Sequence, residues 1–255
     1  MHKKASDIGH RTSDIEHRPS DIERISANLS EIRATIAEVC HRHARNPQDV
    51  RLIAVTKEQE PSVIAPLIAA GVKELGENRI DHLELMQVAA PPEARFHFIG
   101  RVQGRQLAKL APLCVAIHSL CEADHIERLG RACAAACAAA CTTSQRIQVF
   151  VQVNVANDAA KAGVRPDELA QRIEHAQAFP GLEVVGLMTM APLAQAVGAE
   201  GGQADERTIR TCFSALRVLA EHHHLPRLSM GMSDDFHFAV AEGATDIRVG
   251  SRLFR

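Results

Sequence analysis

The stretch Leu52–Lys57, LIAVTK, is the first of eight similar strand signals in this chain. Its segment Leu52–Val55 is apolar and carries β-branched side chains, which favour a buried strand. Lys57 follows at the position where that strand is expected to end. Taken alone, such a lysine is either an ordinary exposed side chain or an amine held in a site, and both alternatives stay open at this point.

Strand-like runs and helix-like stretches alternate along the rest of the chain. The expected strands are Arg51–Val55, Val72–Leu75, Arg95–Ile99, Val115–Leu120, Ile147–Val155, Leu182–Met190, Arg227–Met230 and Asp246–Val249. The helices expected between them are Ser62–Ala70, Ile80–Ala90, Gln103–Leu110, Ala123–Ala140, Pro166–Ala178, Asp205–His224 and Asp234–Glu242. This alternation in 255 residues predicts an α/β fold, a single parallel (β/α)8 TIM barrel. A doubly wound open sheet is the alternative, but no GxGxxG motif follows the first strand.

The N-terminal segment has two parts. Residues 1–19 contain most of a repeat of period seven, SDIGHRT, SDIEHRP and SDIERIS, and are expected to be a flexible leader that ends at Pro19. Apolar residues three or four apart then predict an extra helix over Ser20–Ala44. The chain stops soon after the eighth strand, so this helix is expected to replace the last barrel helix. Residues 20–255 are therefore expected to form one barrel domain.

The composition excludes several classes of protein. Hydrophobic residues make up 46% of the chain and charged residues 24%, as in an ordinary globular protein. The formal net charge of −2 argues against a surface for nucleic acid or membranes. The N-terminal sequence lacks the apolar core of a secretory signal, and no apolar run is long enough to span a bilayer. A cytoplasmic protein is therefore expected.

Two further features of the composition concern chemistry. The odd number of cysteines, seven, favours reduced thiols. Cys133, Cys137 and Cys141 lie four residues apart on one helix face, but no CxxC pair or nearby histidine supports a metal site, so packing residues are expected. The chain contains no tyrosine, and therefore no mechanism that needs a tyrosine acid or base can run on this polypeptide alone.

Several polar or flexible residues lie at or near the expected carboxyl ends of the strands, where barrels of this kind hold their active sites. They are Lys57, Glu77, Asn78, His97, Gly100, Asn154, Thr189, Ser233, Gly250 and Ser251. The loops SMGMSDDF and RVGS offer glycines, hydroxyls and a helix start, which suit a phosphate group. The alternative for Ser233 is a plain helix N-cap beside Asp234 and Asp235. Lys57 together with two such loops indicates a site for pyridoxal 5′-phosphate (PLP), whose aldehyde forms a Schiff base with an amine.

Ordered motifs over roughly Ile22 to Phe254 give this chain a family resemblance. They are LIAVTK, ELGENR, FHFIG, IHSL, QVNVANDAAKAG, GLMTMAP, LSMGMSDDF and RVGSRLF. With them the chain resembles the YggS/PROSC family of PLP homeostasis proteins, whose fold is a barrel like the PLP domain of alanine racemase. The resemblance implies a Schiff base at Lys57, phosphate contacts at Ser233, Gly250 and Ser251 beside Met232, a cofactor-side Asn78, Arg248 facing the pyridine nitrogen, and a second PLP acceptor at Lys161.

One loop departs from the family pattern. The family reads GxLQxNK after the third strand, whereas Gly100–Gln106 reads GRVQGRQ here. Arg105 and Gln106 replace the asparagine and lysine, so a role of this loop in ligand exchange or partner contact is in doubt.

We expect a monomeric PLP carrier that acts in PLP homeostasis, with PLP and PLP-dependent apoenzymes as partners and with no nucleic acid, membrane or metal. The alternative is a PLP-dependent enzyme such as an amino-acid racemase. The missing tyrosine and the expected lack of a second β domain weigh against it. A metabolite-binding barrel without PLP is a third reading, against which the pairing of Lys57 with the phosphate-type loops argues.

Overall fold

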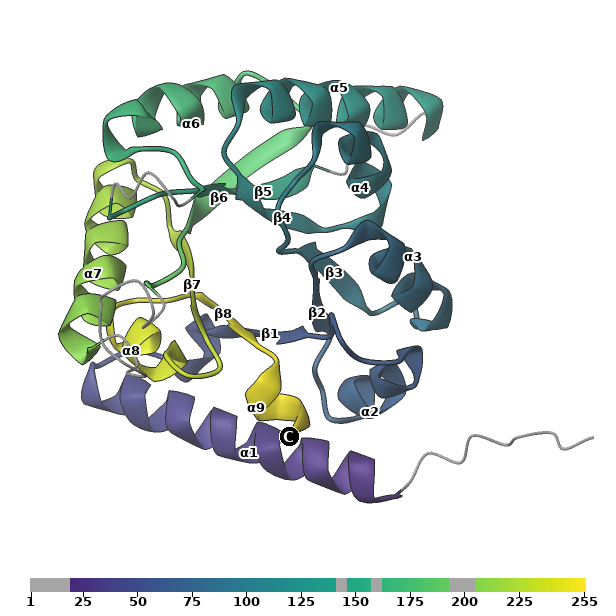
Figure 1. The fold of residues 1–255 in the computed structure, drawn as a ribbon, viewed down its shortest axis with the longest axis vertical. Helices are drawn as coiled ribbons and strands as arrows, with labels where there is room; N and C mark the ends of the chain where they lie inside the picture. The colour runs from purple at the N-terminus through teal and green to yellow at the C-terminus, as the bar shows by residue number, and fades with distance from the viewer. Residues whose placement is uncertain (1–18, 141–145, 157–161, 193–204) are drawn as a thin grey trace, which may run out of the picture.

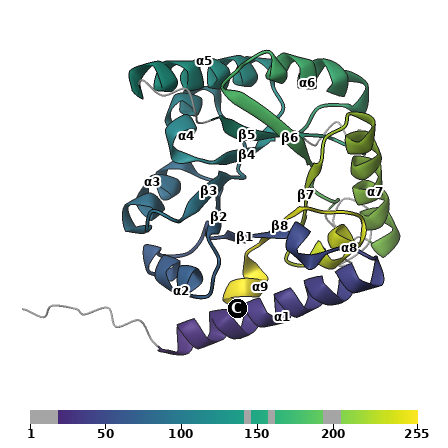
Figure 2. The same cartoon turned by 180° about the vertical axis from the view of Figure 1, so that it is seen from behind.

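The computed structural model describes residues 19–140, 146–156, 162–192 and 205–255. Within these ranges, parallel strands close into a barrel in sequence order, with β1 paired to both β2 and β8. The strands are β1 (Arg51–Val55), β2 (Glu74–Glu77), β3 (Arg95–Phe98), β4 (Ala116–Leu120), β5 (Ile147–Gln152), β6 (Leu182–Met188), β7 (Arg227–Met232) and β8 (Asp246–Val249). Figures 1 and 2 show the strands as an inner ring surrounded by helices. The predicted (β/α)8 barrel is confirmed.

Some strand ends differ from the predicted ones. Strand β2 covers Glu74–Glu77 instead of Val72–Leu75, because its ladder with β3 begins only at Glu74. Strand β5 ends at Gln152, and Val153 makes only an isolated bridge. A ladder of hydrogen bonds ends where the neighbouring strand ends. The hydrophobic pattern of one strand does not reveal where its neighbour will lie.

Helices cover the outside of the barrel. They are α1 (Pro19–Arg42), α2 (Ile64–Ala69), α3 (Ile80–Ala89), α4 (Leu107–Leu113), α5 (Ala123–Ala140), α6 (Leu169–Gln177), α7 (Glu206–His222), α8 (Phe236–Ala241) and α9 (Ser251–Phe254). Short 3₁₀ turns occur at η1 (Pro47–Asp49), η2 (Pro61–Val63), η3 (Gly104–Gln106) and η4 (Pro166–Glu168). Within the described ranges, no helix has the length and apolar character needed to cross a bilayer.

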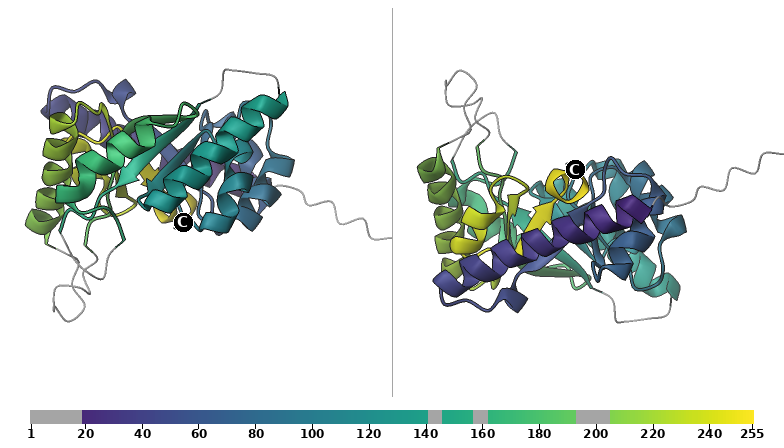
Figure 3. Two further views of the ribbon diagram at one scale, coloured as in Figure 1. Left: turned by 90° about the horizontal axis from the view of Figure 1, so that it is seen from above. Right: turned by 90° about the horizontal axis from the view of Figure 1, so that it is seen from below.

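Helix α1 is the predicted extra helix. It buries one apolar stripe: Ile25, Leu29, Ile32, Ile36 and Val39. It packs on α8 and α9, and Figure 3 shows it running along the side of the barrel beside α9. Asn28 Nδ2 donates to the backbone carbonyls of Leu253 at 3.1 Å and Arg255 at 2.8 Å, which ties the helix to the turn after β8. The predicted leader, apart from Pro19, lies outside the described residues.

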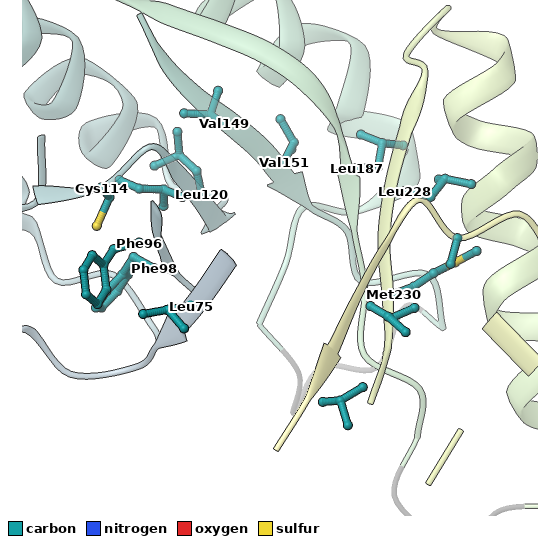
Figure 4. Packing of buried hydrophobic residues seen from close by; sticks show 14 of the residues in the cluster. Leu75, Phe96, Phe98, Cys114, Leu120, Val149, Val151, Leu187, Leu228 and Met230 are labelled. Atoms are coloured by element: carbon teal, nitrogen blue, oxygen red, sulfur yellow. The ribbon is translucent and has the colours of Figure 1, made fainter. Parts of the chain in front are cut away.

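The two faces of the barrel strands differ in polarity. Outward residues pack with the helices into an apolar core, part of which Figure 4 shows around Phe96, Phe98, Val149 and Leu187. His118 of β4 and Ser229 of β7 are hydrogen-bonded at 2.7 Å, and because these strands are not neighbours, both side chains must face the interior. The bonded polar residues of this interior are Glu74, His97, His118, Gln148, Arg227, Ser229, Asp246 and Arg248. Branched apolar side chains usually fill this space.

Candidate functional site

A cavity of about 640 Å³ lies at the carboxyl ends of the strands. Seven of the predicted PLP-binding residues line it: Lys57, Asn78, Met232, Ser233, Arg248, Gly250 and Ser251. They come from the ends of β1, β2, β7 and β8 and from the loops that follow, which meet at one mouth because the strands are parallel. The predicted second acceptor, Lys161, lies outside the described residues.

Lys57 stands at the rim of this cavity. Its side chain is 45% exposed, and its Nζ lies 3.6 Å from Glu58 Oε1. The lysine thus combines both alternatives that the sequence left open, since it is solvent-accessible and also lines the cavity. The backbone turns just after it, where the amide of Gln59 donates to the carbonyl of Thr56 at 2.8 Å.

A buried glutamate braces the loop that carries Lys57. Glu77, the last residue of β2, is fully buried and accepts a hydrogen bond from Thr56 Oγ1. Its Oε2 lies 2.8 Å from His82 Nδ1, and the other ring nitrogen of His82 lies 3.0 Å from the carbonyl oxygen of Gln59. Burial raises the pKa of Glu77, although its hydrogen bonds from Thr56 and His82 act against the rise.

The loops after β7 and β8 meet at Ser233. Its Oγ accepts hydrogen bonds from the backbone amides of Gly250 at 3.2 Å and Arg252 at 3.4 Å. The N-cap alternative for Ser233 is wrong, because α8 begins at Phe236 and the preceding residue is Asp235. The hydroxyl instead joins the two loops that the sequence singled out for phosphate.

Asp235 does not face the cavity as a free anion. Its Oδ1 accepts a hydrogen bond from the backbone amide of Met232 at 2.5 Å. Burial raises the pKa of Asp235, with the Met232 hydrogen bond and the charge of Arg248 acting against the rise. Its neighbour Asp234 does line the cavity.

Arg248 forms a buried wall of the cavity and is only 4% exposed. Its guanidinium donates to Ser229 Oγ at 2.5 Å and to the Thr189 carbonyl at 3.1 Å. Burial lowers the pKa of Arg248 to about 10. That value is far above neutral pH, so the cavity contains a permanent cation.

Asn78 presents an unsatisfied acceptor. Its Oδ1 is buried and has no hydrogen-bond partner among the described residues, which is rare for a side-chain oxygen. The backbone of Gly100 passes so close to Asn78 that a Cβ at that position would lie 2.0 Å from the Asn78 carbonyl oxygen. Glycine is therefore required there, and the close approach fixes the Asn78 backbone.

Other sequence expectations have mixed outcomes. His97 lies in the barrel interior and not at the rim, because its side chain points toward Glu74. Cys133 is buried as expected, whereas the side chain of Cys137 and all of Cys141 lie outside the described residues. Among the residues that the structure does describe, no cluster of three metal-type ligands occurs.

Sequence reasoning missed two interior residues that contact the site indirectly. Ser229 supports Arg248, and His118 supports Ser229. Each is a polar residue that interrupts the apolar residues of its strand, in IHSL or RLSMGM. That interruption is the available signal, but nothing in it says which partner the polar side chain meets.

The fold and the cavity together define a ligand-binding parallel barrel with an accessible amine, a buried guanidinium and hydroxyl groups at its mouth. Residues 21–255 match the family model described as alanine racemase, N-terminal domain. A pyridoxal phosphate homeostasis protein of Aquifex aeolicus is 33% identical over 226 residues, covering 84% of this chain and 90% of that protein. The human protein of that name is 31% identical over 228 residues, covering 83% and 80%.

A solved structure agrees with these relatives. PipY of Synechococcus elongatus with PLP bound superposes with a TM-score of 0.75 at 28% identity, covering 91% of this chain and all of that one. The chain therefore belongs to the family of the pyridoxal phosphate homeostasis proteins, as its motifs predicted.

Proposed function

We propose that this protein binds PLP and acts in PLP homeostasis as a carrier, with Lys57 Nζ forming a Schiff base to the PLP aldehyde. The observation that carries the proposal is the convergence of the seven predicted residues on one cavity. The names of the relatives and the PLP in the PipY structure support the choice of ligand.

The chemistry of the cavity fits PLP group by group. Lys57 supplies an amine for the aldehyde. Ser233 and Ser251 supply hydroxyls, and the Gly250 amide already points at a Ser233 oxygen that a phosphate oxygen could replace as its acceptor. The unsatisfied Oδ1 of Asn78 remains available to a ligand donor or a bridging water.

Arg248 bears on how strongly bound PLP could withdraw electrons, and the missing tyrosine bears on the choice between a carrier and an enzyme. Bound PLP supplies an electron sink, and that sink is strongest when its ring nitrogen is protonated. A buried cation beside the ring nitrogen disfavours that proton, and Arg248 keeps its charge at neutral pH. The chain also has no tyrosine to serve as a second acid or base.

Replacing Lys57 tests the proposal. The purified protein loaded with PLP should show an absorbance band near the visible edge, and borohydride should fix PLP to the peptide that contains Lys57. Lys57→Ala should lose both signals. Lys109→Ala is the matched control, because Lys109 also lies 3.6 Å from a glutamate, Glu84, but does not line the cavity. A fixed PLP on another lysine, with Lys161 the first to inspect, would contradict the assignment of Lys57.

The remaining expectations belong to this proposal. We propose a cytoplasmic monomer that passes PLP to PLP-dependent apoenzymes. Light scattering tests the monomer, and activation of an apoenzyme by the loaded protein tests the transfer. Clear exchange of the α-hydrogen of amino acids in heavy water would instead support the racemase-like alternative and overturn the carrier.

A further inference from the structure

We infer that a directed chain of hydrogen bonds through the barrel interior positions the Arg248 guanidinium at the cavity. Its members lie on five different strands and are, in order, Glu74, His97, His118, Ser229 and Arg248. We call these five residues the interior chain. The inference rests on the proposed function only in its second half, which concerns how Arg248 meets PLP.

The contacts of the interior chain are short and shielded from water. Glu74 Oε2 lies 2.6 Å from His97 Nε2, and His97 Nδ1 lies 2.9 Å from His118 Nε2. His118 Nδ1 lies 2.7 Å from Ser229 Oγ, to which Arg248 donates at 2.5 Å. The two histidines and the serine are fully buried. Phe150 stacks on His118 with ring centroids 4.3 Å apart, which fixes the plane of the imidazole.

One end of the interior chain is an anion. Burial acts to raise the pKa of Glu74, but the hydrogen bond from His97 and the positive charges of Arg51 and Arg95 outweigh it, so that the net pKa is lowered. Glu74 is therefore a carboxylate at neutral pH and can only accept hydrogen bonds. The other end, Arg248, can only donate them.

The two ends fix the position of every proton between them. Burial lowers the pKa of His97 and of His118, so both rings are neutral and each has one N–H. The Glu74 carboxylate requires the His97 proton on Nε2. His97 Nδ1 is then a bare acceptor, which requires the His118 proton on Nε2.

The same reasoning continues to the cavity. His118 Nδ1 is bare and accepts the Ser229 hydroxyl proton. The lone pairs of the Ser229 oxygen then face Arg248, and this oxygen accepts a hydrogen bond from the guanidinium. If the hydroxyl were free to rotate, its proton could face the guanidinium and repel it, so His118 is what keeps Ser229 an acceptor.

The consequence is a positioned cation. Ser229 Oγ and the Thr189 carbonyl hold two corners of the Arg248 guanidinium, and its remaining surface borders the cavity. His118 and Ser229 are therefore positioning residues that act on the ligand through Arg248. If the PLP ring nitrogen meets Arg248, as the family resemblance implies, they would hold an Arg248 N–H toward that nitrogen and so disfavour its protonation.

The first test needs no PLP. Nitrogen-15 NMR of histidine-labelled protein without ligand reports which ring nitrogen is protonated. We expect His97 and His118 both to be neutral with the proton on Nε2 at pH 7.5. A proton on Nδ1 of either ring, or a charged ring, would overturn the directed chain.

The second test uses PLP labelled at the ring nitrogen. Ser229→Ala removes the acceptor of Arg248, so the guanidinium is no longer held in place at the cavity. We expect the Kd for PLP to rise about tenfold, because Arg248 then makes a poorer hydrogen bond to the ligand. The ring-nitrogen signal should also move toward the protonated position. Ser119→Ala is the matched control, because Ser119 is a buried barrel serine that donates to the Gly100 carbonyl outside the interior chain. Ser229→Thr should restore the wild-type values.

The outcomes separate this inference from the proposed function. If PLP is not fixed to Lys57, the proposed Schiff base fails while the histidine measurement still decides the direction of the interior chain. If PLP is fixed to Lys57 but Ser229→Ala matches Ser119→Ala in Kd and ring-nitrogen signal, the positioning role fails alone.

Discussion

Lys57 depends on residues that do not touch the cavity. Glu77 and His82 hold the turn at Thr56–Gln59 through hydrogen bonds at its two ends. The lysine extends from that turn into the solvent-accessible mouth. A flexible amine on a braced backbone can reach an aldehyde without the whole loop having to be ordered on binding, which reduces the entropic cost of binding.

This arrangement makes a prediction for His82. His82→Ala removes the ring that joins the Gln59 carbonyl to the buried Glu77 carboxyl, which keeps only its hydrogen bond from Thr56. We therefore expect faster amide hydrogen exchange at residues 57–59 and a Kd for PLP about tenfold higher. His175→Ala serves as the control, since His175 is also partly buried beside a glutamate, Glu127, but on the outer helices. Equal behaviour of the two variants in exchange and PLP titration would contradict the bracing role.

At the scale of elements, helix α1 supports the part of the barrel that carries the loops of the cavity. It lies against α8 and α9, which flank the loops after β7 and β8. Those loops contribute Ser233 and Gly250 to the cavity, and the first residue of α9 contributes Ser251. The packing of α1 therefore supports the phosphate side of the proposed site as well as the fold.

Two isoleucines of α1 test this support. Ile32 is fully buried, and Ile32→Ala should lower the free energy of unfolding by about 2–5 kcal/mol through lost burial and a cavity. Ile22 is 40% exposed on the same helix, and Ile22→Ala should cost less than about 1 kcal/mol. Urea unfolding measures both values, and similar losses for the two variants would show that α1 does not pack as described.

At the scale of the whole molecule, the polar barrel interior makes stability depend on pH. His97 and His118 have lowered pKa values because they are buried, whereas in the unfolded chain they titrate near 6.5. Below about pH 6.5 these histidines bind protons in the unfolded chain but stay neutral in the folded protein. Stability is therefore unaffected by these groups above about pH 7 and falls as the pH drops below about 6.5.

The size of this effect can be measured. Each histidine contributes a slope of up to about 1.4 kcal/mol per pH unit between its unfolded and folded pKa values. Urea unfolding at pH 7.5, 6.5 and 5.5 should show the loss, and His118→Phe should flatten the slope by about one histidine. Besides burial, the charges of Arg248, Arg227 and Arg51 lower the pKa of His118 further, and protonation of His97 would lower it again. A slope that His118→Phe leaves unchanged would mean that His118 is protonated in the folded protein.

The sequence by itself determined the barrel and the residues of the mouth. Strand and helix signals alternate over the chain, and parallel strands necessarily gather their carboxyl ends at one side. Lys57 and the loops at Ser233 and Gly250 could therefore be assigned to one site before any coordinates were known. Local periodicity is enough for this, because it encodes the order and type of elements.

Only the tertiary structure decided which interior residues meet. His97 could be placed on β3 but not inside the barrel, and nothing in IHSL or RLSMGM pairs His118 with Ser229 across the ring. These contacts depend on how the strands are staggered when the sheet closes, which is a property of all the strands together. The same closure decides where the strands end. It also decides that Ser233 contacts the Gly250 amide and that Ser229 contacts Arg248.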